Sequence, residues 1–380
     1  MELFHLLRSS ISGEKLSDEE REKFSSEQLH KLLELSHKHD VAHLLALGIK
    51  RNELTSKVDM DIEEYIFKAV YRHERKRYDL ENLCNALEKA RIPFMPLKGA
   101  IVVRYYPEEW MRTSCDIDIL VSKENSEKAM SVLVDEYGYT YGGKSSHDIS
   151  LYTPSKVHVE LHYDLIEEGR INRSSEILIT AWDTATIREG FSYWYEMPDE
   201  MLYFYHISHM AKHLIEGGCG IRPFIDLWIL ENIHEANAEK RNMLLEQGDL
   251  LKFANVVRKL SKIWFESEDK DPISEQVELY ILHGGVYGNT CNRIMLQQQK
   301  KGGRINYALS KIFIPYDVIK FHYPILQKYR WLTPIMEVRR WCKLIFCGHL
   351  KRITREIHYS NNITPAEAAG MQKFLNSIGL

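Results

Sequence analysis

Two aspartates stand inside an apolar run that otherwise has the composition of a buried strand. The segment reads TSCDIDILV and contains Asp116 and Asp118. Alternate residues of a strand share a face, so both carboxylates would point the same way, about 6.5–7 Å apart along the strand. Ile117, Ile119 and Val121 would then point into a core. Buried carboxylates need a partner, and a divalent cation such as Mg²⁺ takes their oxygens as ligands, so the spacing predicts a metal site.

A second apolar run, KVHVELHYDL, repeats this alternation. His158, Glu160 and His162 share one face, and three apolar residues share the other. If the two strands are neighbours in a sheet, Glu160 supplies a third carboxylate. Three carboxylates on adjacent strands can hold one or two Mg²⁺ (or Mn²⁺) ions, the apparatus for moving a nucleotidyl or phosphoryl group. A D-x-D alone is common and is often only a capped turn, so the prediction depends on the later glutamate and on a glycine turn upstream.

That glycine turn is formed by Gly99, between a predicted strand and the helix-like AIVVRYY. Backbone N–H groups at such a turn can hold a triphosphate. Lys98 and Arg112 would add positive charge on either side. Ser114 would hydrogen-bond a phosphate or order the loop before the first aspartate. These residues are therefore candidates for holding a triphosphate.

The elements that must position these residues fall into three regions. Residues 1–90 carry leucines at helical spacing, and residues 196–380 are helical again. Between them, residues 91–195 alternate strand-like runs with a helix that stops at a glycine, SEKAMSVLVDEYG, and a hairpin that turns at TPSK. This order predicts an α+β fold with a mixed sheet in the core, flanked by N-terminal and C-terminal helical regions.

Three histidines, His206, His209 and His213, recur at helical spacing in the C-terminal region, and Lys212 flanks them. One interpretation is a polar face turned towards the nucleotide or the acceptor. A metal site is another, although no acidic residue lies at the right spacing, and a face packed on the core is a third. His206, His209 and Lys212 are therefore candidate nucleotide contacts.

Other features have a structural explanation beside the functional one. Arg222 and Asp226 are i, i+4 partners and predict an ion pair on one helix, with substrate contact as the alternative. The glycine-rich HGGVYG lacks the strand before and helix after that a phosphate loop needs, so it predicts an interhelical turn. Residues 328–359 are basic and contain Trp331 and Trp341. They predict a solvated face with the tryptophans packed inward, or else contact with RNA, a membrane surface or an acidic partner.

The composition is that of a globular protein. The 380 residues are 44% hydrophobic and carry a net charge of −4, which argues against a nucleic-acid binder over its whole surface. No apolar run approaches the roughly 20 residues of a membrane helix, the N-terminus lacks the layout of a signal peptide, and six cysteines form no C-x-x-C pair. We expect a soluble cytoplasmic protein with reduced thiols and no membrane partner. The sequence gives no indication of the oligomeric state.

LKGAIVVRYYPEEWMRTSCDIDILV, followed by VHVELHYDL, resembles the uncharacterised nucleotidyltransferase family of the DNA-polymerase-β-like superfamily. HISHMAKHL…GIRPFIDLWIL also resembles that family's helical region, and the likeness covers roughly residues 30–240. It implies a polymerase-β-like core with Asp116 and Asp118 as metal ligands and Glu160 as the third carboxylate. The superfamily's usual Gly-Ser is replaced here by Lys98-Gly99-Ala100.

The resemblance implies Mg-dependent transfer of a nucleoside monophosphate from an NTP to a hydroxyl acceptor. The acceptor is open: a small molecule, a protein or an RNA. Glu160, His162 or His158 could take the acceptor's proton. The alternative is a non-catalytic protein of the same fold that binds a ligand or partner. A metal-dependent phosphohydrolase would need a His-Asp pair on adjacent turns, which the chain does not offer in a convincing form.

Overall fold

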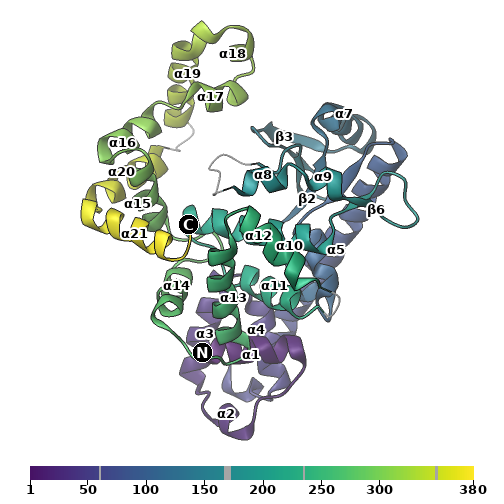
Figure 1. The fold of residues 1–380 in the computed structure, drawn as a ribbon, viewed down its shortest axis with the longest axis vertical. Helices are drawn as coiled ribbons and strands as arrows, with labels where there is room; N and C mark the ends of the chain where they lie inside the picture. Colours follow the sequence, from purple (N-terminus) through teal and green to yellow (C-terminus); the bar gives the residue numbers. More distant parts are fainter. Residues whose placement is uncertain (60, 167–172, 234–235, 347–349) are drawn as a thin grey trace.

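The computed structural model describes residues 1–59, 61–166, 173–233, 236–346 and 350–380 (Figure 1). Helices surround a five-stranded mixed sheet, so the predicted α+β fold with helical regions on both sides is confirmed. None of the described helices combines the length and apolar composition that a membrane crossing needs.

The N-terminal region is helical, as the leucine spacing predicts. Helix α3 begins with a capping box, in which Ser25 and Gln28 each accept a hydrogen bond from the other's backbone N–H. Helix α5 is the longest and runs up behind the sheet (Figure 1). The elements are α1 (Glu2–Ser12), α2 (Asp18–Glu22), α3 (Ser26–Lys38), α4 (Ala42–Arg51), η1 (Thr55–Lys57) and α5 (Ile62–Lys89).

The sheet has the strand order β1-β2-β5-β4-β3, in which β2 and β5 are parallel and the other neighbours are antiparallel. The predicted hairpin is confirmed as β4 and β5, with TPSK in its turn. Helix α7 ends at Gly138 with φ 71°, the predicted glycine stop. The strands are β1 (Phe94–Pro96), β2 (Asp116–Val121), β3 (Thr140–Lys144), β4 (Asp148–Tyr152) and β5 (His158–His162).

Short elements connect the strands and lead out of the sheet. They include a separate two-stranded hairpin. The elements are α6 (Gly99–Val102), η2 (Val103–Tyr105), η3 (Glu109–Met111), η4 (Lys123–Asn125), α7 (Ser126–Tyr137), α8 (Ser174–Leu178), α9 (Ala181–Thr184), β6 (Thr186–Ile187) and β7 (Tyr195–Glu196).

The C-terminal region is helical throughout its described residues. Helices α10 to α14 lie beside the sheet and the N-terminal helices, whereas α15 to α21 extend away on the left of Figure 1. The elements are α10 (Asp199–Ile215), α11 (Arg222–Glu231), α12 (Ala238–Gln247), α13 (Leu251–Phe265), α14 (Pro272–His283), α15 (Thr290–Lys300), α16 (Arg304–Ile312), α17 (Tyr316–His322), α18 (Ile325–Lys328), η5 (Arg330–Leu332), α19 (Thr333–Phe346), α20 (Leu350–Asn362) and α21 (Pro365–Ser377).

The two faces of β2 are buried in different hydrophobic clusters. Ile117, Ile119 and Val121 pack with apolar residues of α5 and α7, as the alternation predicts. Leu120, on the aspartate face, belongs to a larger cluster that also contains residues of α1, α4, α10 and α13. Helices α1, α4, α10 and α13 therefore share a core with the face that carries the carboxylates, whereas much of α5 packs on the opposite face. The division of the chain at residues 90 and 195 stays a prediction.

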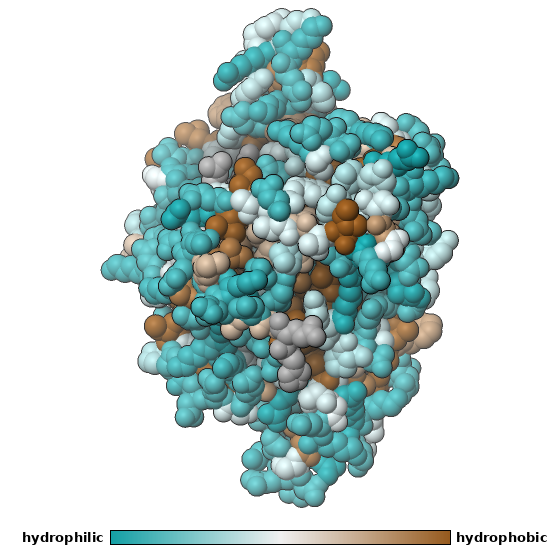
Figure 2. All heavy atoms as spheres, turned by 45° about the vertical axis from the view of Figure 1, so that its right-hand side comes forward, coloured by the Kyte–Doolittle hydropathy of each residue, from teal (hydrophilic) through white to brown (hydrophobic). Residues whose placement is uncertain are grey.

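The basic segment 328–359 is only partly described, because residues 347–349, with Cys347, lie outside the described residues. Trp341 packs inward and donates its indole N–H to the carbonyl of Ile312 at 3.0 Å. Trp331 is 72% exposed, so the expectation that both tryptophans pack inward is wrong for Trp331. Elsewhere the visible surface is mostly hydrophilic, with scattered apolar groups (Figure 2).

Candidate active site

Strands β2 and β5 lie side by side and run in the same direction. Asp116 lies opposite His158, and Asp118 lies opposite Glu160. The condition for a third carboxylate, that the two strands are neighbours, is therefore confirmed. Because opposite residues of paired strands point to the same face of a sheet, all of these side chains lie on the face that meets the C-terminal helices.

Three side chains on this face form a group that could hold a metal ion: Asp118, Glu160 and His162. Each offers one ligand atom, and these atoms all lie within 4.8 Å of one another. Nε2 of His162 is 2.9 Å from Oδ1 of Asp118 and 3.3 Å from Oε2 of Glu160. Asp116 is not a member of this group, but it lines a cavity that Asp118 and Glu160 also line. The sequence pointed to His162 only as a proton acceptor, and the structure adds a possible ligand.

The cluster concentrates negative charge in a buried place. Burial raises the pKa of Asp116, and the carboxylate of Asp118 adds to the rise. Burial acts in the same sense on Asp118, but the ammonium of Lys98 and the hydrogen bond with His162 outweigh it, so its pKa lies well below the usual range. Burial alone would lower the pKa of His162, but its hydrogen bonds with Asp118 and Glu160 outweigh burial and raise it. Such a site favours a cation.

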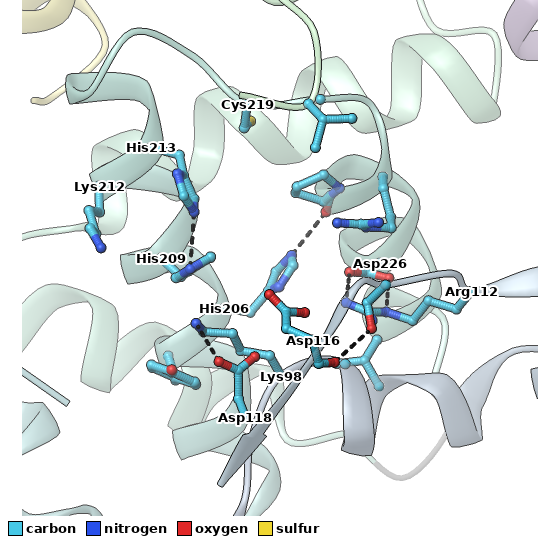
Figure 3. A pocket seen from close by; sticks show the side chains of 18 of the residues that line it. Lys98, Arg112, Asp116, Asp118, His206, His209, Lys212, His213, Cys219 and Asp226 are labelled. Carbon is cyan, nitrogen blue, oxygen red and sulfur yellow. Dashed lines mark hydrogen bonds and ion pairs between the residues drawn. The ribbon is translucent and has the colours of Figure 1, made fainter. Parts of the chain in front are cut away.

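Lys98 and Gly99 form the turn between β1 and α6. Lys98 has φ 41°, a left-handed conformation that is uncommon outside glycine, and its Nζ lies 3.4 Å from Oδ1 of Asp118 (Figure 3). The N–H groups of Ala100 and Ile101 donate to backbone carbonyls of the same turn. These two amides are therefore not open to a phosphate group, and the side chain of Lys98 is the positive charge that the turn presents to the carboxylates.

Arg112 lines the cavity, but its guanidinium is hydrogen-bonded to a buried carboxylate. Its Nε and Nη2 donate to the two oxygens of Asp226, each at 2.8 Å, and the hydroxyl of Tyr106 donates to the same carboxylate at 2.7 Å (Figure 3). The predicted pair between Arg222 and Asp226 is wrong. Asp226 points inward, where Arg112 meets it, and Arg222 donates to the carbonyl of Thr113 at 2.7 Å.

Ser114 orders the loop before β2, which is one of the two roles expected of it. Its hydroxyl accepts a hydrogen bond from Lys76 and donates to the carbonyl of Asp116 at 3.2 Å. Lys76, on α5, was missed, because it stands in the charged run ERKRYDLE, where a solvated face is the ordinary interpretation. It is only 8% exposed, and burial, helped by the charge of Arg112, lowers its pKa to about 8.

We expect Lys76 to add a pH-dependent component to the stability. Its folded pKa of about 8 lies below the ordinary 10.5, so the unfolded state binds more protons between these values. Stability contributed by this group therefore rises as the pH rises through that window. In urea unfolding, the gain from pH 7.5 to pH 9.5 is expected to be larger in the parent than in Lys76→Met, by on the order of 1–2 kcal/mol. The exposed Lys68→Met is the control, and equal gains in the parent and Lys76→Met would contradict the assignment.

Helix α10 forms one wall of the cavity, which has a volume of about 400 Å³. His206, His209, Lys212 and His213 all line it (Figure 3). Nε2 of His206 bonds to the carbonyl of Pro223 at 2.9 Å, and the Nε2 atoms of His209 and His213 lie 3.1 Å apart. Burial lowers the pKa of all three histidines, that of His213 to about 4, so the rings are neutral at pH 7. Of the three interpretations, the polar face turned towards the cavity fits this placement.

The structure also brings residues to the cavity that the sequence did not single out. They come from separate segments of the chain, so no local pattern could have joined them. The HGGVYG segment lies between α14 and α15, as predicted, but it also borders the cavity. Val286 and Tyr287 are the residues of this segment that line the cavity, and the residues not singled out before include His39, His147 and Tyr205.

Comparison with known proteins identifies one family. The family described as uncharacterised nucleotidyltransferase matches residues 25–266, more than half of the 380 residues. This range contains β2, β5 and the histidine-bearing helix α10. No curated protein and no solved structure matches the chain. The chain belongs to the uncharacterised nucleotidyltransferase family.

Proposed function

We propose that this protein transfers a nucleoside monophosphate from an NTP to a hydroxyl group of an acceptor, and that Asp116, Asp118 and Glu160 hold Mg²⁺ (or Mn²⁺). The observation that carries the proposal is the parallel pairing of β2 and β5. This pairing places Asp118 opposite Glu160 at a cavity that also contains Lys98 and the polar face of α10. Family membership supports the class of reaction.

The donor set fits a hard divalent cation. Carboxylate oxygens are the ligands that Mg²⁺ and Mn²⁺ prefer. Burial raises the pKa of Asp116 and the carboxylate of Asp118 adds to the rise, and a bound cation would oppose both effects by favouring the ionised carboxylates. A bound ion would neutralise charge on the triphosphate and on the pyrophosphate that leaves. His162 would hold the carboxylate of Asp118 in place through their 2.9 Å hydrogen bond.

In the proposed reaction, the acceptor's hydroxyl oxygen forms a bond to the α-phosphorus. The bond between that phosphorus and the bridging oxygen of pyrophosphate breaks, and the hydroxyl proton moves to a base in the cavity. Glu160 is our candidate base, because its side chain is 30% exposed and borders the cavity. His162 is only 2% exposed. His158 is as exposed as Glu160, but it bonds to Ser150 and is not among the residues that line the cavity.

The nucleotide contacts divide into two kinds. Lys98, His209 and Lys212 line the cavity and would meet the phosphates with an ammonium or an imidazole N–H. Arg112 and Ser114 also line the cavity, but they are bound to Asp226 and Lys76, so we assign them to holding the turn and the loop in place.

The acceptor stays open among small molecules, proteins and RNA. A non-catalytic protein of the same fold is the second candidate, because Lys98-Gly99-Ala100 replaces the superfamily's Gly-Ser. The cytoplasmic location also stays a prediction.

The experiment that tests the proposal uses α-labelled ATP, GTP, CTP and UTP, each with Mg²⁺ or Mn²⁺. We expect metal-dependent binding of at least one NTP to the full chain, and transfer of its label to an acceptor in a cell extract. The variant Glu160→Gln should lose the transfer, whereas the exposed Glu136→Gln on α7 should retain it. Binding without transfer would favour the non-catalytic candidate, and no binding of any NTP would refute the proposed transfer reaction.

A further inference from the structure

The loop of residues 284–289, between α14 and α15, is fixed at both ends. The N–H of Val286 donates to the carbonyl of Lys38 at 3.1 Å, and the N–H of Asn289 donates to the carbonyl of Gly217 at 2.8 Å. Nζ of Lys38 donates to the carbonyl of His283 at 2.9 Å, just before the loop. The segment is thus tied to α3 and to the turn after α10.

Glycines allow this close packing. A Cβ at Gly288 would lie 2.6 Å from the carbonyl oxygen of Gly217, and Gly288 has φ 68°. A Cβ at Gly220 would lie 3.2 Å from Cα of Val286. Gly288 requires a residue without a side chain, because backbone lies against backbone there, and at Gly220 a side chain would be tight against Val286. The packing holds the loop, and with it Tyr287, in place.

Tyr287 stands between the two anchors and lines the cavity, yet the residue is 88% exposed. Tyr205, which also lines the cavity, is only 5% exposed and offers no open ring face. Tyr287 therefore presents an aromatic ring at the border of the cavity, on a backbone that is already ordered. A ligand that covers the ring would gain apolar contact without the entropic cost of ordering the loop.

The loop and the carboxylates lie at different ends of the cavity. Gly220, which packs on Val286, directly follows Cys219, and Figure 3 shows Cys219 on the opposite side of the cavity from Asp118. The Asp118 end contains the carboxylates and Lys98. The cavity therefore has a charged end and an end bordered by an exposed aromatic ring.

We propose that Tyr287 stacks on the nucleobase of the NTP whose triphosphate lies at the Asp118 end; this inference rests on the proposed function. An NTP matches the two ends of the cavity, because it has a charged triphosphate at one end and a flat aromatic base at the other. Stacking on an aromatic side chain depends little on which base is present. Tyr287 would then contribute affinity for all NTPs, and selection among them would fall to other residues.

The test compares two ligands that differ only in having a nucleoside: Mg-NTP and Mg-tripolyphosphate. Binding of each is measured by titration calorimetry on the full chain and on Tyr287→Ala, Tyr287→Phe and Tyr78→Ala, the last an exposed tyrosine on α5. We expect Tyr287→Ala to weaken NTP binding by about 5- to 150-fold, the range of one base–aromatic stack. Tyr287→Phe and Tyr78→Ala should bind NTP like the parent, and tripolyphosphate should bind all four proteins equally.

Each other outcome overturns the inference in a distinct way. Unchanged NTP binding by Tyr287→Ala would show that the ring does not touch the base. Equal weakening of NTP and tripolyphosphate would show that the residue only supports the loop. If the parent binds neither ligand, the proposed function itself fails, and the stacking role fails with it.

Discussion

Replacing Asp118 by asparagine is expected to lower nucleotidyl transfer by about 10²–10³-fold and to weaken the binding of Mg-NTP. Asp118 is the carboxylate at the centre of the cluster: it contacts Lys98 and His162 and lies opposite Glu160. The amide of asparagine keeps the shape of the side chain but removes the negative charge that a cation would meet. The measurement is Mg-dependent binding and transfer of a labelled NTP.

Two controls separate this effect from a general loss of structure. Asp135→Asn changes the same group at an exposed position of α7 and should behave like the parent. Thermal unfolding of Asp118→Asn should show that the protein remains folded. If Asp118→Asn binds Mg-NTP as tightly as the parent and transfers at the same rate, the metal site is not where we place it.

The second large effect is on stability: replacing Asp226 by leucine is expected to cost about 3–5 kcal/mol of the free energy of unfolding. The side chains of Arg112 and Asp226 are 7% and 2% exposed and form two hydrogen bonds of 2.8 Å. Removal of the carboxylate leaves a buried guanidinium without its partner. Urea denaturation at pH 7 measures the loss.

Matched variants identify the ion pair as the cause. Arg112→Met combined with Asp226→Leu should lose less than Asp226→Leu alone, because no buried charge is left behind. Tyr106→Phe removes one hydrogen bond to the carboxylate and should cost about 1.5–3 kcal/mol. If Asp226→Leu unfolds within about 1 kcal/mol of the parent, the pair does not stabilise the fold.

The same pair gives a pH dependence with a definite sign. Burial would raise the pKa of Asp226, but the guanidinium of Arg112 and its hydrogen bonds outweigh burial and lower it. Below the ordinary pKa of a carboxyl group, the unfolded state takes up the proton before the folded state does. The stability contributed by Asp226 is therefore present at neutral pH and is lost as the pH falls through the acid range.

The parts of the site that could be predicted from the sequence are those set by local periodicity. Alternation along β2 placed Asp116 and Asp118 on one face of the strand. Alternation along β5 placed Glu160 on the same face as His158 and His162. Gly138 ended α7 as a glycine in the left-handed conformation does. In each case the responsible residues lie within one or two elements, so the pattern is readable before the chain is folded.

The parts that could not be predicted depend on contacts between distant segments. An i, i+4 spacing shows only that Arg222 and Asp226 share a helix face. It cannot show that Arg112, far away in the sequence, reaches the carboxylate first. Lys76 likewise stands in a charged run that is typical of a solvated face. Only the packing of α5 against the loop that contains Ser114 shows that it is buried. Charged residues are ambiguous for this reason, since the same side chain serves at a surface or in a buried pair.

The turn before the site is where this chain departs from the superfamily that its sequence resembles. In place of Gly-Ser, it presents Lys98 in a left-handed conformation with the ammonium 3.4 Å from Asp118. A strained residue that reaches into a cluster of carboxylates is typical of a functional turn. We infer that Lys98 balances part of the negative charge before a nucleotide arrives, and that it then meets the triphosphate.

The most direct test of the metal site is a crystal structure of the full chain with Mn²⁺ and an NTP analogue whose α–β bridge cannot be cleaved. Mn²⁺ can be located by its anomalous scattering, independently of the protein atoms. We expect an anomalous peak for a Mn²⁺ ion bound by the carboxylates of Asp118 and Glu160, with the analogue's phosphates beside it. A bound analogue with no peak at these carboxylates, or with the peak elsewhere, would contradict it.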